Sequence, residues 1–193
     1  GECLWQLARH AAAIATWQKN LVAHPSDSQT HAKLGAALSH QGKHAEALAS
    51  YEQATTGAPG DPSLALETAR IALSLSKIDQ AVPHLERVVK LTPNDPEAWQ
   101  MLGQSYRAKN LTDLALNALQ RAVQAAPHLS KPHAALARLL NEINKLPDAL
   151  TAISDALAID PDSFEVISTA CDVFIKANRL TQAITAARKM IRL

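Results

Sequence analysis

The residue types in this sequence that could carry out chemistry are eight histidines, two cysteines and scattered serines. His40 and His44 are four residues apart, but Gly42 lies between them and indicates a turn. Cys3 and Cys171 are far apart, and no cluster of cysteines or carboxylates accompanies the histidines at metal-ligand spacing. No serine lies in a Gly-x-Ser-x-Gly segment, and no glycine-rich phosphate-binding loop occurs. We therefore expect no catalytic residue, metal or cofactor, and a protein that is not an enzyme.

Composition excludes further classes of function. Lys and Arg number 19 against 18 Asp and Glu, a net charge of +1, which gives no basic footprint for nucleic acid or an anionic membrane surface. Apolar runs are too short to span a membrane, and Arg9 and His10 interrupt the alanine-rich beginning. Because the sequence has neither an initiating Met nor a leader pattern, we expect a fragment of a longer protein. Its cellular compartment is left open.

The strongest pattern is a repeat of 34 residues. Five prolines recur at this step, at Pro25, Pro59, Pro93, Pro127 and Pro161. Six alanines do the same, at Ala13, Ala47, Ala81, Ala115, Ala149 and Ala183. When this alanine is numbered position 20, five repeats begin at residues 28, 62, 96, 130 and 164. Residues 1–27 then form a partial repeat, mainly its second helix, and a period of this length predicts one continuous solenoid domain over residues 1–193.

Each repeat divides into two helices joined by a short turn. The turn falls at position 15, which holds Gly42, Ser76, Asn110, Asn144 and Asn178, and Gly and Asn tolerate left-handed backbone. The proline at position 32 ends the second helix. We expect helices over residues 28–41, 45–57, 62–75, 79–91, 96–109, 113–125, 130–143, 147–159, 164–177 and 181–192, and no strands. Positions 8 and 20 are small, which predicts a close approach of antiparallel helices and a structural role for Cys171 at position 8.

These columns resemble those of the tetratricopeptide repeat family. The third repeat matches the family motif at Trp99, Leu102, Gly103, Tyr106, Ala115, Ala122 and Pro127. The resemblance implies an all-α, right-handed superhelical solenoid of antiparallel helix pairs. It also implies a non-catalytic scaffold that binds a peptide or partner segment in a concave groove, which the first helices of the repeats line.

In that groove the resemblance places positions 2, 5, 9, 12 and 13 of each first helix. The candidate partner-binding residues are Gln29, Arg70, Leu73, Gln100, Gln104, Arg107, Lys131, Arg138 and Asp172. The three arginines and two central glutamines form a donor-rich strip, which suits carboxylates and phosphates and favours an acidic partner. An alternative interpretation is an ordinary solvated face, because Glu67 and Glu142 lie three and four residues from Arg70 and Arg138 and could neutralise them.

Two further hypotheses concern the wider protein. The array could instead dock substrates or regulate within a larger enzyme of glycosyltransferase, sulfotransferase or oxygenase type. The last helix carries Leu180, Ala183, Ile184, Ala187 and Ile191 on one face, and the N-terminal helix is expected to expose the neighbourhood of Leu4, Trp5 and Ile14. Exposed apolar faces of this kind favour end-to-end self-association through the Ile184 and Trp5 faces.

Overall fold

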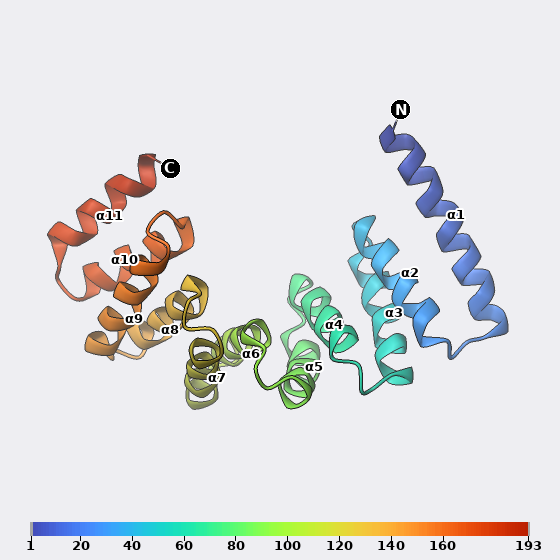
Figure 1. The fold of residues 1–193 in the computed structure, drawn as a ribbon, viewed down its shortest axis with the longest axis horizontal. Coiled ribbons are helices and arrows are strands. Elements are labelled where there is room, and N and C mark those ends of the chain that lie inside the picture. The colour runs from blue at the N-terminus through green and yellow to red at the C-terminus, as the bar shows by residue number, and fades with distance from the viewer. Residues whose placement is uncertain (1, 193) are drawn as a thin grey trace. The chain divides into compact units, whose positions relative to one another are not determined.

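The computed structural model describes the backbone of residues 2–192 and the side chains of residues 11–192. This part of the chain contains eleven helices and no strand, and is therefore all-α as predicted (Figure 1). The chain divides into two compact units, Gly1–Pro93 and Asn94–Leu193. The second unit begins two residues before the predicted start of the third repeat at residue 96.

The first unit holds five helices: α1 (Glu2–Ala23), α2 (Ser28–His40), α3 (His44–Gly57), α4 (Pro62–Ser74) and α5 (Ile78–Leu91). Each packs mainly against its neighbours in the chain. Asp27 and Asp61 begin α2 and α4 as N-caps, since each carboxylate accepts the backbone N–H groups two and three residues further on. The caps set the points at which these first helices start.

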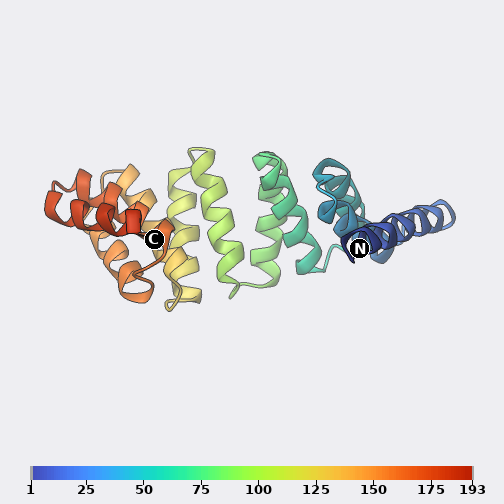
Figure 2. The same cartoon turned by 90° about the horizontal axis from the view of Figure 1, so that it is seen from above.

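The second unit holds six helices: α6 (Pro96–Ala108), α7 (Thr112–Ala125), α8 (Ser130–Glu142), α9 (Leu146–Ile159), α10 (Phe164–Lys176) and α11 (Leu180–Arg192). They form three antiparallel pairs, the shape that a short turn imposes (Figure 2). In this unit α8 also contacts both α6 and α10, the first helices of the adjacent pairs. The first helices of this unit therefore form a continuous face.

All ten predicted helices are confirmed, each within one residue of its predicted bounds. The turns are confirmed too, because the described residues with positive φ are those at position 15: Gly42 (75°), Ser76 (59°), Asn110 (59°), Asn144 (61°) and Asn178 (57°). Glycine adopts this left-handed backbone freely, and asparagine tolerates it better than most residues.

The small columns also have the predicted cause. Ala47, Ala81, Ala115 and Ala149 have no exposed surface, so the alanine column is buried between the two helices of each pair. A Cβ added at Gly103 would lie 2.7 Å from Cγ of Leu119, and one at Gly35 would lie 2.9 Å from the ring of Tyr51. The helices of these pairs approach too closely for a larger residue.

The N-terminal helix differs from the repeat pattern. The 34-residue register places a turn near Ala8, with the remnant of a separate first helix before it, but α1 runs unbroken from Glu2 to Ala23. Alanine stands where the other repeats have Gly, Ser or Asn, and Arg9 and His10 follow it, so nothing there favours left-handed backbone. The side chains of Cys3, Leu4 and Trp5 lie outside the described residues.

Candidate functional site

The nine predicted groove residues all lie on first helices of the pairs. Those of the first unit are Gln29 on α2 and Arg70 and Leu73 on α4; those of the second are Gln100, Gln104 and Arg107 on α6, Lys131 and Arg138 on α8, and Asp172 on α10. All nine are exposed or half-buried. Six of the nine lie in the second unit, where a shared cavity or a contact places four between adjacent first helices: Gln100, Arg107, Lys131 and Arg138.

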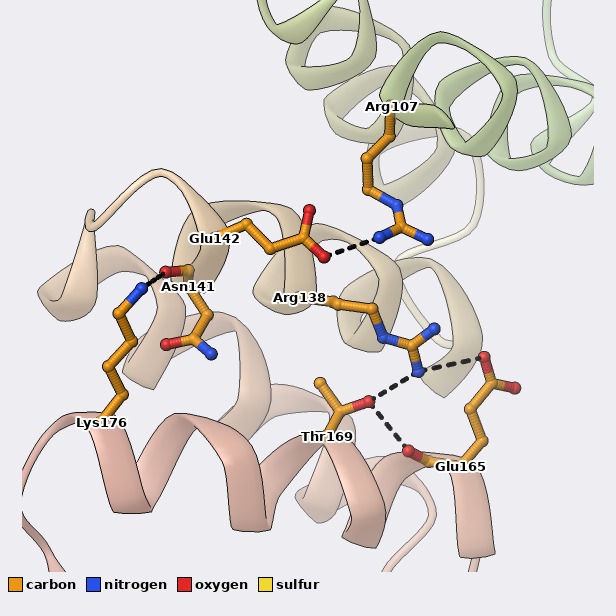
Figure 3. A network of polar contacts seen from close by, with 7 residues as sticks. All are labelled: Arg107, Arg138, Asn141, Glu142, Glu165, Thr169 and Lys176. Atoms are coloured by element: carbon orange, nitrogen blue, oxygen red, sulfur yellow. Dashed lines mark hydrogen bonds and ion pairs between the residues drawn. The ribbon is translucent and has the colours of Figure 1, made fainter. Parts of the chain in front are cut away.

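Arg107 on α6 is held by a carboxylate from the next pair. Its Nη1 lies 2.6 Å from Oε1 of Glu142, at the end of α8 (Figure 3). Both side chains keep a third or more of their surface exposed, so solvent screens the attraction. The contact nevertheless fixes the arginine across the gap between two first helices.

Arg138 on α8 repeats this arrangement one pair further on. Its Nη2 donates to Oγ1 of Thr169 at 3.0 Å and lies 3.9 Å from Oε1 of Glu165, both on α10. The Thr169 hydroxyl in turn donates to the backbone carbonyl of Glu165. Thr169 is buried, so the arginine completes the hydrogen bonding of a group withdrawn from water.

A third contact ends the series. The Nζ of Lys176 on α10 donates to the backbone carbonyl of Asn141 on α8 (Figure 3). We call the contacts Arg107–Glu142, Arg138–Thr169/Glu165 and Lys176–Asn141 the cross-repeat ladder. In its first and last contacts, position 12 of one repeat meets position 13 of the next, so the ladder follows the 34-residue period.

The ladder bears on the alternative interpretation of the arginine strip, in which Glu142 could neutralise Arg138, four residues before it on the same helix. Glu142 instead pairs with Arg107 of the preceding pair. Spacing along one helix does not tell which side chains of a neighbouring helix lie within reach. Within α4 the expected pair is present, with Nε of Arg70 3.6 Å from Oε1 of Glu67. The arginine strip thus has carboxylates beside each of its cations.

The opposite end of the same face is hollow. A cavity of about 560 Å³ lies between the N-terminal halves of α6 and α8, and its lining includes Gln100, Met101, Leu129, Ser130, Lys131 and Pro132. Gln100 and Lys131 were candidates from the sequence. Met101 and Leu129 were missed, because neither occupies a position that the resemblance places in the groove. We call this cavity the α6–α8 hollow.

Two histidines and the described cysteine have structural surroundings. His31 and His133, both at position 4, have Nε2 2.9 Å and 3.0 Å from the carbonyl oxygens of Pro25 and Pro127 in the preceding turns. Cys171 is buried, and burial, with Asp172 nearby, raises the pKa of its thiol. Among the described residues no group of three or more His, Cys, Asp or Glu could hold a metal ion. No helix in the described part is long and apolar enough to cross a membrane.

Stacked helix pairs with αL turns and a polar face built from the first helices define a class of α-helical repeat proteins. A family model described as tetratricopeptide repeat matches residues 38–105 and 106–168, more than half of the sequence. The chain belongs to the tetratricopeptide repeat family. A second model, bacterial transcriptional activator domain, matches residues 1–57. Neither model identifies a catalytic family, and no curated protein matches the sequence significantly.

Solved structures agree with this assignment at the level of the fold. A tetratricopeptide repeat protein from Parabacteroides merdae has a TM-score of 0.82 at 15% identity, over 99% of this chain and 76% of its own. MamA has a TM-score of 0.76 at 16% identity, over 86% and 90%. YrrB, described as a TPR protein with an unusual peptide-binding site, has a TM-score of 0.71 at 18% identity, over 91% of both chains. Tetratricopeptide repeat arrays serve as scaffolds for protein interaction, and this chain shares that general role.

Proposed function

We propose that this scaffold binds an extended peptide segment of a partner protein along the face of its first helices. In the second unit the α6–α8 hollow is the main point of contact. The observation that carries the proposal is the hollow itself, since an open cavity of about 560 Å³ lies on the face predicted to bind, at the end opposite the ladder. The peptide-binding site described for YrrB supports the same general use of the fold.

The residues of the hollow suit a peptide. The amide of Gln100 can donate to and accept from a peptide backbone, and Lys131 can meet a carbonyl or carboxylate. Met101 and Leu129 supply apolar surface, and a methionine adapts its shape to different side chains. The remaining predicted residues of the second unit, Gln104, Arg107, Arg138 and Asp172, would extend the contact along its first helices. Gln29, Arg70 and Leu73 are separate candidates for contact with the first unit.

The test begins with peptides selected from a random dodecapeptide library on the whole chain. We expect the variant Gln100→Ala/Met101→Ala to weaken binding of the selected peptides by roughly tenfold or more, in line with truncation of an interface centre. Arg121→Glu, on the exposed outer surface of α7, is the matched control. Peptides that bind the hollow variant and the wild type equally would contradict this site.

An acidic partner is a narrower form of the proposal. If Arg70, Arg107 and Arg138 attract acidic groups, reversing all three to Glu should weaken binding and flatten its dependence on salt. Because Glu142 and Glu165 already lie against two of these arginines, an acidic peptide must displace them. Selected peptides without an excess of Asp and Glu, bound equally by the triple variant, would leave the strip as structural surface.

Self-association is a second candidate, which a specific observation favours. Leu180, Ile184 and Ile191 on α11 are 58%, 53% and 84% exposed. Their counterparts one repeat earlier include Leu150 and Leu157, which are partly buried and packed on the core. We propose that the α11 face pairs with a second copy, and we expect Ile184→Lys to abolish this pairing without loss of helix. A strict monomer in sedimentation of the wild type at high concentration would contradict it.

A further inference from the structure

The outer side of the second unit carries an apolar slot between two second helices. It lies between α9 and α11, over α10, and has a volume of about 290 Å³. Its walls include Leu157, Pro161, Ile167, Phe174 and Ala186. None of these residues belongs to the first-helix face of the proposed function, and a cavity of this size fits one apolar side chain.

A basic cavity adjoins the slot. It has a volume of about 580 Å³, is lined by Arg188 and Arg192, and shares Thr185 and Lys189 with the slot. Lys189 pairs with the carboxylate of Asp162 at 2.8 Å, which ties α11 to the turn before α10. No ion pair found among the described residues engages Arg188 or Arg192, and both are exposed. The two arginines thus give this rim a net positive charge.

The equivalent groove one pair earlier has the opposite character. There His133 and Asp155 occupy the places that Ile167 and Lys189 hold in the slot, with Nδ1 of His133 3.8 Å from the Asp155 carboxylate. The imidazole also reaches the carbonyl of Pro127. The slot therefore has an apolar residue, Ile167, where the earlier groove has a hydrogen-bonded histidine. It has a cation, Lys189, where the earlier groove has a carboxylate.

The basic rim lies on positions that remain open when repeats stack. Thr185, Arg188, Lys189 and Arg192 occupy positions 22, 25, 26 and 29 of the last repeat. Two further helix pairs follow α7 in the chain, and its residues at the same positions are nevertheless exposed: Asn117, Gln120, Arg121 and Gln124. The rim is consequently available to a partner whatever covers the end face of α11.

We propose that the slot and its basic rim bind an acidic peptide segment of a partner protein. An apolar side chain of the segment enters the slot between α9 and α11, and neighbouring Asp or Glu carboxylates pair with Arg188 and Arg192. Arginine suits this task because its planar fork meets a carboxylate through two hydrogen bonds. The positive rim and the apolar slot together select for both features in one segment. This site is independent of the first-helix face.

The test uses four fluorescein-labelled octapeptide pools and the whole chain, with binding followed by polarisation. The first pool has a central Leu or Phe flanked by Asp and Glu; the others replace the flanks by Gln, the flanks by Lys, or the centre by Ala. We expect the first pool to bind, and to bind more weakly as salt rises. Gln flanks or an Ala centre should each reduce the affinity by roughly tenfold.

Variants then locate the site. Arg188→Glu/Arg192→Glu should weaken binding of the first pool by at least about tenfold, with Arg188→Gln/Arg192→Gln as a milder form that keeps the helix. Ala186→Leu should weaken it as well, because the longer side chain fills the slot. The matched controls are Arg121→Glu on α7, at the position of Lys189, and Ala158→Leu on α9, at the position of Arg192. Both controls should bind like wild type.

Three results would overturn the proposal. The first is equal binding of the pools with acidic and with basic flanks. The second is unchanged binding by the double charge-reversal variant, with circular dichroism showing that it is folded. The third is binding of phosphatidylserine vesicles but of none of the four peptide pools, which would assign the basic rim to a lipid surface. None of these outcomes depends on whether a peptide binds the α6–α8 hollow, so each of the two proposed sites can be refuted without refuting the other.

Discussion

The two units link their helix pairs in different ways. In the first unit the contact between α3 and α4 includes a buried pair of hydroxyls, with Oγ1 of Thr55 2.9 Å from Oγ1 of Thr68. In the second unit the first helices touch one another directly, and the cross-repeat ladder of charged side chains joins them at the surface. The Thr55–Thr68 link lies inside the core, and the ladder lies on the face that we propose for binding.

The two kinds of contact differ in what they can contribute to stability and to partner binding. A buried hydroxyl pair is shielded from salt and pH, but it offers nothing to a partner. A surface ladder contributes little to the free energy of unfolding, because water screens exposed charges. It does hold Arg107, Arg138 and Lys176 in position on the same face, at the end opposite the α6–α8 hollow. The second unit therefore has the more organised polar surface.

The largest expected effect on the free energy of unfolding concerns a feature that both units share, the close approach of the two helices of a pair at the position 20 alanine. Ala47→Leu in the first unit and Ala115→Leu in the second should each lower the free energy of unfolding by about 1–3 kcal/mol, because both alanines are fully buried where helices meet. Chemical denaturation measures the loss, and hydrogen exchange shows which unit opens first. Ala158→Leu, on the exposed side of α9, is the control. An unchanged midpoint for Ala115→Leu would mean that the alanine column has another cause.

The buried hydroxyl link should have a smaller effect, confined to the first unit. Thr55→Val should cost about 1 kcal/mol, since it removes the contact with the Thr68 hydroxyl and the hydrogen bond that Thr55 donates to the carbonyl of Tyr51. The double variant Thr55→Val/Thr68→Val should cost less than the sum of the two single changes, because each single change already removes the contact between the two hydroxyls. Denaturation of the four proteins as a double-mutant cycle measures the coupling. Strict additivity would show that the two hydroxyls do not interact.

The ladder should have a smaller effect still. The coupling free energy between Arg107→Gln and Glu142→Gln should stay below about 1 kcal/mol and fall as salt is raised, since both groups are partly exposed. Peptide affinity is expected to change more than stability does, because the arginine loses its fixed position. A coupling of several kcal/mol, insensitive to salt, would erase the distinction between the units.

The smallest effect is one of pH on the start of α2. Hydrogen bonds to Asp27, first from the side chain and backbone of Thr30 and then from Gln29, lower the pKa of its carboxyl below 3.8. A lowered folded pKa means that the contribution is present above the unfolded value and is lost as pH falls through the folded one. Acid titration below about pH 4 should therefore loosen the start of α2. Asp27→Asn should remove this pH dependence, as judged by amide NMR shifts.

Amino-acid spacing alone predicted the helices and turns to within a residue, because the same physical constraint recurs in each repeat. Asn110, Asn144 and Asn178 stand where backbone must turn left-handed, and small residues stand where helices meet. The N-caps at Asp27, Asp61 and Asp95 were also readable, since Asp directly before a first helix is a cap signal.

The polar contacts between repeats could not be predicted in the same way. Arg107 meets Glu142 thirty-five residues later, and that pairing depends on the offset between helix axes, which no single-helix spacing contains. The α6–α8 hollow and the outer slot depend on that offset as well. Helix α1 shows the opposite limit of the repeat pattern. The 34-residue register predicts a turn near Ala8, but the residue types that allow the turn are absent there, and the helix continues unbroken.

The buried thiol of Cys171 offers a way to measure how often the last helix pair opens. Its thiol lies in the core against the backbone of α11, with Sγ 3.9 Å from the carbonyl oxygen of Ala183, and burial raises its pKa. Thiol reagents react with the thiolate, which burial disfavours. Labelling therefore requires that α10 and α11 separate and expose the thiol to solvent. In a Cys3→Ser background the labelling rate would count these opening events directly. A ligand seated in the slot between α9 and α11 would slow that rate, reporting occupancy without any label on the ligand.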